Sequence, residues 1–115
     1  MEGRRLAFEL TVPGNVMGEV DRRVNELYRK AGYGDALLHR TGHGIGVTGH
    51  EAPFLADGYE HVIESGMVFT IEPGIYLPGI GVFRHSDTVL TTADGNVSLT
   101  DGPTELGDLT LPLSV

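Results

Sequence analysis

The chain has 115 residues, which is enough for one small domain and too few for two. Sixteen acidic residues against eight basic ones give a net charge of −8, which argues against nucleic acid and anionic membrane surfaces as partners. The absence of cysteine excludes disulfides, thiolate metal sites and a cysteine nucleophile, so His, Asp and Glu would have to hold any metal.

The N-terminal part of the chain reads as helical. Residues 4–10 form a short helical or extended piece, and a Pro-Gly turn follows it. Asn15 is a suitable N-cap for a second helix, which we expect to end at Gly32. This helix carries one apolar stripe at helical spacing, formed by Val20, Val24, Leu27 and Ala31.

The remainder reads as extended chain. Glycine fills four of the eight positions 42–49, which excludes a stable helix and predicts a backbone packed closely against its neighbours. Alternation predicts a strand over residues 67–72, a second over 82–92 and a third over 97–100. Turns are expected at 64–66 and 79–81, and a hairpin at 94–95. Helices followed by antiparallel strands predict an α+β fold.

A glycine pattern of the dinucleotide-binding type occurs at Gly44, Gly46 and Gly49. Its context is wrong, because Pro53 follows closely and no amphipathic helix begins there to hold a pyrophosphate. We therefore interpret the match as accidental.

Glu72 is a hydrophilic residue at the end of an apolar strand. Because a glutamate is rarely buried without a partner, it requires a cation, a basic side chain or water. A metal ion is one interpretation, and an ion pair with Arg84 is an equally weighted alternative. His43 and His50, in the glycine-rich stretch, are candidate imidazole ligands.

Three linked segments resemble the signature of the pita-bread metallopeptidases, with the best match to Xaa-Pro aminopeptidase and Xaa-Pro dipeptidase. Residues 39–46 read HRTGHGIG, residues 50–51 read HE, and residues 66–76 read GMVFTIEPGIY. The resemblance implies an α+β fold in which two helices pack on a curved antiparallel sheet. It also implies hydrolysis of the bond between an N-terminal residue and proline by a metal-activated hydroxide.

In that family two Asp, one His and two Glu hold two divalent ions, commonly manganese, cobalt, iron or zinc. By position His43 and Glu72 correspond to metal ligands, and His50 to a histidine that contacts the substrate and assists catalysis. Arg84 would brace the site. These donors suit hard and borderline divalent cations.

The family's last motif usually reads Arg-Ile-Glu-Asp-Thr, but residues 84–88 read RHSDT here. Ser86 therefore stands in the place of the second ligand glutamate, and a neutral hydroxyl is a poor substitute for a bridging carboxylate. Either His85 or Asp87 is recruited instead, or one metal is lost, or the site is altered. Because neighbours on a strand face opposite sides, recruitment would require a bulge or a changed register.

The family's two Asp ligands lie on strands N-terminal to the matched region, and neither Asp21 nor Asp35 has that setting. We therefore expect residues 1–115 to form the second half of a pita-bread catalytic domain. An exposed apolar face and sheet edge would then favour a homodimer or a separate N-terminal half as partner. Alone, the chain is expected to hold one ion or none and to be inactive.

A second hypothesis is a pita-bread module that binds without catalysis, because fold does not fix function. Ser86 favours this alternative, whereas the three intact candidates favour the peptidase with a substrate carrying proline in second position. The sequence has no apolar run that approaches a membrane span and no signal peptide, so we expect a cytoplasmic location. Its acidity and the single lysine, Lys30, would suit a high-salt cytoplasm.

Overall fold

The computed structural model describes residues 1–37 and 39–112. Two helices come first, α1 (Glu2–Leu10) and α2 (Met17–Lys30), followed by a 3₁₀ turn, η1 (Gly34–Ala36). The strands are β1 (Gly42–Gly44), β2 (Glu51–Leu55), β3 (Val68–Ile71), β4 (Gly74–Leu77), β5 (Gly81–Arg84), β6 (Asp87–Thr92) and β7 (Gly95–Ser98). A short helix, α3 (Leu106–Leu109), follows them.

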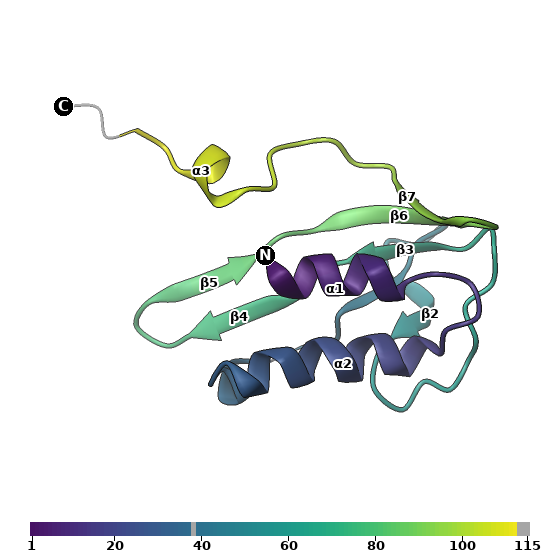
Figure 1. Cartoon of the computed structure of the whole chain (residues 1–115), viewed down its shortest axis with the longest axis horizontal. Coiled ribbons are helices and arrows are strands. Elements are labelled where there is room, and N and C mark those ends of the chain that lie inside the picture. Colours follow the sequence, from purple (N-terminus) through teal and green to yellow (C-terminus); the bar gives the residue numbers. More distant parts are fainter. Residues whose placement is uncertain (38, 113–115) are drawn as a thin grey trace.

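Five strands form one antiparallel sheet in the order β2-β1-β3-β6-β7, and β4 and β5 form a separate two-stranded hairpin. Figure 1 shows α1 and α2 side by side against the sheet, with the β4–β5 hairpin extending beyond it. The arrangement confirms the predicted α+β class, with two helices on an antiparallel sheet.

The core lies between the two helices and the sheet. Both helices contribute buried apolar side chains, and β2, β3, β6 and the segment between β2 and β3 contribute the others. The members are Ala7, Met17, Val20, Val24, Leu55, Ile63, Phe69, Ile71 and Val89. Burial of these apolar surfaces is the main force that holds α2 against the strands. In the described part of the chain, no helix combines the length and the apolar character needed to cross a bilayer.

The predicted N-cap of the second helix is wrong. Val16, not Asn15, occupies the cap position, and no side chain caps the helix. Instead, the Met17 amide donates to the His61 carbonyl and the Gly18 amide to the Tyr59 carbonyl, at 2.8 Å each. The end of the helix is as predicted, because Gly32 follows Ala31 with a left-handed φ of 91°.

The predicted single strand over residues 82–92 is also wrong. β5 ends at Arg84 and pairs only with β4, whereas β6 begins at Asp87 and pairs with β3 and β7. The two residues between them form hydrogen bonds outside both ladders: the His85 ring contacts the Pro103 carbonyl, and the Ser86 hydroxyl donates to Glu72. The chain therefore changes sheets at this point.

Glycine in the 42–49 stretch allows the close approach that the sequence predicts. A Cβ atom on Gly42 would overlap the carbonyl oxygen of Thr70 on β3, and one on Gly46 would overlap the Glu51 carboxylate. Gly49, in contrast, has open space around it. The short strand β1 can therefore lie against β3 only because Gly42 lacks a side chain.

Candidate metal centre

His43 is the buried member of the candidate site. It lies at the middle of β1, its side chain is 4% exposed, and its backbone amide donates to the Thr70 hydroxyl at 3.1 Å. The ring atom Nδ1 lies 2.8 Å from the Gly44 carbonyl oxygen. Because a carbonyl oxygen only accepts, Nδ1 carries the proton of the neutral ring, and the lone pair is at Nε2.

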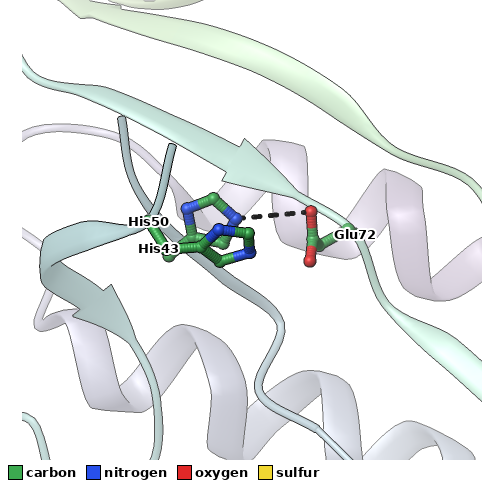
Figure 2. Close-up of side chains that lie close together, drawn as sticks. All are labelled: His43, His50 and Glu72. Carbon is green, nitrogen blue, oxygen red and sulfur yellow. Dashed lines mark ion pairs between the residues drawn. The ribbon is translucent and has the colours of Figure 1, made fainter. Parts of the chain in front are cut away.

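Glu72 faces this lone pair. It follows β3 directly, and its backbone amide donates to the Thr41 carbonyl at 2.7 Å. Its Oε2 atom lies 3.6 Å from His43 Nε2, with the carboxylate 17% exposed. Two electron-pair donors thus face a common point from adjacent strands, and Figure 2 shows this approach.

His50 completes the group from the loop between β1 and β2. Its ring stacks on that of His43, with centroids 4.0 Å apart and 28° between the planes. One nitrogen or oxygen atom from each of His43, His50 and Glu72 lies within 4.8 Å of the others, as Figure 2 illustrates. His50 is exposed, so this side of the group opens to solvent.

The alternative partner for Glu72, Arg84, does not pair with it in the described structure. Arg84 is exposed on β5, where it lies opposite Gly74 in register, whereas the Glu72 carboxylate faces His43 Nε2. Instead the Ser86 hydroxyl, where the motif resemblance leads us to expect a second glutamate, donates to Glu72 Oε2 at 3.3 Å. Ser86 therefore borders the candidate site but supplies a neutral hydroxyl there.

Asp87 and His85 are engaged elsewhere. Asp87 is buried on β6 and accepts hydrogen bonds from Arg4 Nε and from the Thr100 hydroxyl, each at 2.7 Å. His85 Nδ1 lies 3.3 Å from Asp87, while its Nε2 lies 3.0 Å from the Pro103 carbonyl. His85 lies outside both strands, so its approach to Asp87 follows from the change of sheets and not from the alternation of a regular strand.

Burial by itself would raise the pKa of Asp87, but the surrounding donors outweigh it. Hydrogen bonds from Arg4 and Thr100, together with the charges of Arg4 and His85, hold the pKa of Asp87 below its ordinary value of 3.8. This carboxylate thus ties α1, β6 and the segment after β7 together, and each of its oxygens accepts a hydrogen bond within that network.

The donor set fits a divalent cation. Two imidazoles and a carboxylate suit borderline and hard ions such as zinc, cobalt, iron and manganese. The hydrogen bond from His43 Nδ1 to a carbonyl fixes the tautomer that leaves Nε2 free, as partners of metal-bound histidines do. Within the described residues the group contains a single carboxylate, so it offers three donors in all.

Sequence reasoning missed the role of Asp21, which is not one of the three donors but holds the chain next to β1. Asp21 is 4% exposed on α2 and accepts hydrogen bonds from Thr41, next to β1. A signal was available, because position 21 falls between Met17 and Val24 on the apolar stripe, where an acidic residue needs buried donors.

Comparison with known proteins places the chain in a family. Residues 1–93 match metallopeptidase family M24. The Xaa-Pro dipeptidase of Pyrococcus furiosus is 42% identical over 106 residues, which cover 92% of this chain and 30% of that protein. Among solved structures, the Xaa-Pro dipeptidase from Bacillus anthracis superposes with a TM-score of 0.87 at 41% identity. The prolidase from Pyrococcus horikoshii OT3 gives 0.88, also at 41% identity.

Both solved structures match 91% of this chain, and the chain matches 30% of each of them. It thus spans about three tenths of the length of the relatives it resembles. The superposition confirms the pita-bread fold that the motifs implied. With the family match covering most of the sequence, the chain belongs to metallopeptidase family M24.

Proposed function

We propose that His43 and Glu72 hold a divalent cation, with His50 beside it, as part of a site that hydrolyses Xaa-Pro peptides. The observation that carries the proposal is the convergence of His43 Nε2 and Glu72 Oε2, 3.6 Å apart, on one point, with the third donor within 4.8 Å. The Xaa-Pro dipeptidases among the relatives support the choice of substrate.

Each residue has a distinct part in this proposal. A bound divalent cation supplies Lewis acidity, which polarises a peptide carbonyl and lowers the pKa of water. His43 presents a lone pair whose direction the Gly44 carbonyl fixes, and Glu72 adds the negative charge. The exposed ring of His50 can donate a hydrogen bond to a substrate oxygen.

Completion of the site requires further carboxylates from outside residues 1–115, which a second copy of the chain or an N-terminal half of the domain would supply. The apolar surface supports such a partner: on β5, Val82 is 60% exposed and Phe83 is 57% exposed. Exposed apolar side chains of this size are typical of surfaces that associate. Residues 1–115 would then be one part of the catalytic domain, and manganese, cobalt, iron and zinc are all compatible with the donors.

One observation favours a second candidate function, a pita-bread module that binds peptides without cleaving them. The neutral Ser86 hydroxyl occupies one side of Glu72, where the family places a carboxylate. A site with a single carboxylate binds a divalent cation more weakly than one with several, because both charge and ligand number fall. This alternative requires no metal.

Thermal unfolding with and without Mn²⁺ separates the two. A cation that binds only the folded chain raises the Tm, so the peptidase proposal expects a rise for the wild type and none for His43→Ala or Glu72→Gln. Substrate class is tested by titrating the Mn²⁺-loaded protein with Ala-Pro and with Ala-Ala. We expect tighter binding of Ala-Pro, and equal affinities would contradict the proline preference.

A further inference from the structure

The β1–β2 segment that carries both histidines is fastened at its two ends to a single carboxylate. Asp21 Oδ1 accepts from the Thr41 amide at 2.8 Å and from the Thr41 hydroxyl at 2.7 Å, just before β1 begins. Asp21 Oδ2 accepts from the Asp57 amide at 2.8 Å, shortly after β2 ends. One side chain on α2 therefore holds the entry and the exit of this segment.

The same residue is connected to the third donor. The carbonyl of Thr41 accepts the backbone amide of Glu72 at 2.7 Å. Two hydrogen bonds to Asp21 therefore fix the position of Thr41, and a third, from the Glu72 amide to the Thr41 carbonyl, fixes the position of Glu72. His43 lies two residues further along the chain, so both facing donors depend on where Thr41 lies.

Burial gives this arrangement its rigidity. Asp21 is 4% exposed and Thr41 is 1% exposed, so water does not replace a broken bond without local opening. In the described structure Asp21 takes part in no ion pair, and hydroxyl and amide donors satisfy its carboxylate. Hydrogen bonds to a buried carboxylate are stronger than those between neutral groups.

We infer that Asp21 is a positioning residue that sets the placement of His43, His50 and Glu72 relative to one another. This inference rests on the proposed function for its consequence, metal affinity, but not for its geometry. Residues that orient metal ligands through hydrogen bonds change affinity by roughly tenfold to a hundredfold when they are substituted. Asp21 does so from outside the donor group, through Thr41 before β1 and Asp57 after β2.

The decisive variant is Asp21→Asn. It keeps the shape of the side chain but replaces one of the two accepting oxygens with an NH₂ group, which cannot accept a hydrogen bond. The matched control is Asn96→Asp. Asn96 donates to the Phe8 and Thr11 carbonyls at 2.7 and 2.8 Å, so the reverse isosteric change breaks two side-chain bonds at the end of α1. Both variants lose stability, but only Asp21→Asn alters the clamp, by which we mean the hydrogen bonds from Thr41 and Asp57 to Asp21.

Two readouts are compared. In the metal-free protein, amide hydrogen exchange is followed by NMR at Glu72, with the Thr91 amide of β6, which donates to the Met67 carbonyl, as internal reference. The second readout is the Mn²⁺ dissociation constant, measured by calorimetry. Asp21→Asn should accelerate Glu72 exchange about tenfold or more relative to Thr91 and weaken Mn²⁺ binding roughly tenfold to a hundredfold. Asn96→Asp should leave Mn²⁺ binding unchanged and should not raise the ratio of Glu72 to Thr91 exchange, because Asn96 lies opposite Thr91 in register and loosening there accelerates only the reference amide.

The inference is overturned if the two variants behave alike in the Glu72 to Thr91 exchange ratio. If the wild type binds no Mn²⁺, the proposed function fails. The exchange ratio alone then still tests whether Asp21 positions Glu72. Should Asp21→Asn not fold, Thr41→Val removes only the hydroxyl bond and Thr41→Ser retains it. Accelerated Glu72 exchange in the valine variant and normal exchange in the serine variant are then expected, and equal rates in the two would contradict the inference.

Discussion

Replacement of Ser86 by Glu places a second carboxylate beside Glu72, which should destabilise the metal-free fold and strengthen its stabilisation by metal. Ser86 Oγ lies 3.3 Å from Glu72 Oε2, so the new carboxylate would lie about 4 Å from the existing one. At that separation two like charges repel by about 1 kcal/mol in water and about 4 kcal/mol at an effective dielectric constant of 20. Ser86 is exposed, so the lower figure is closer.

Loss of the hydroxyl hydrogen bond adds about 1 kcal/mol, giving a total near 2 kcal/mol in the metal-free protein. In a domain of this size that corresponds to a Tm lower by about 8 °C. The matched control Ser86→Gln has the same shape and no charge, and its amide can still donate to Glu72. We expect the glutamate variant to melt below the glutamine variant without metal.

Saturating Mn²⁺ should invert the order, because a second carboxylate strengthens binding and a cation at 100 times its dissociation constant adds about 2.7 kcal/mol. Scanning calorimetry of both variants, with chelator and with Mn²⁺, makes the comparison. If the glutamate variant melts with or above the glutamine variant in chelator, residue 86 does not lie beside Glu72 as described. If Mn²⁺ fails to raise its Tm more than that of the glutamine variant, the cation does not bind at this point.

Two further substitutions test the packing and the charge network. Gly42→Ala should lower the unfolding free energy by about 3 kcal/mol, because the new Cβ meets the Thr70 carbonyl. Gly49→Ala, in open space, should change it by less than about 0.5 kcal/mol. Equal losses of unfolding free energy in urea titrations would refute the close-packing argument. Asp87→Asn should cost about 2 kcal/mol at neutral pH. Because the folded pKa of Asp87 is depressed, this stabilisation is complete above about pH 5 and disappears as the pH falls below 3.8 through the folded value. The gap between wild type and variant should therefore close in acid unfolding curves, and a gap independent of pH would contradict the network.

Local patterns predicted much of the fold. The apolar stripe gave α2 and its end at Gly32, and alternation gave β3, because these signals depend on neighbouring residues. The cap at Asn15 failed because carbonyls of Tyr59 and His61, more than forty residues away, satisfy the helix instead. No pattern within a few residues of the helix start carries that information.

The candidate site was likewise only partly predictable from the sequence. The motifs identified His43, His50 and Glu72, and the structure brings all three together. The route of residues 85 and 86 between two sheets was not predictable, since it depends on Pro103 and Glu72 rather than on strand propensity. Asp21 was missed because its donors come from positions 20 and 36 residues further along the chain.

The most direct test of the metal centre is calorimetric titration of Mn²⁺ into the metal-free chain, with His43→Ala as the control. His43 is buried and provides the Nε2 lone pair that faces Glu72, so its removal takes away one of two facing donors. A saturable isotherm that the variant abolishes is the predicted result. Absence of binding, or an isotherm that the variant leaves unchanged, would contradict a divalent cation held by His43 and Glu72.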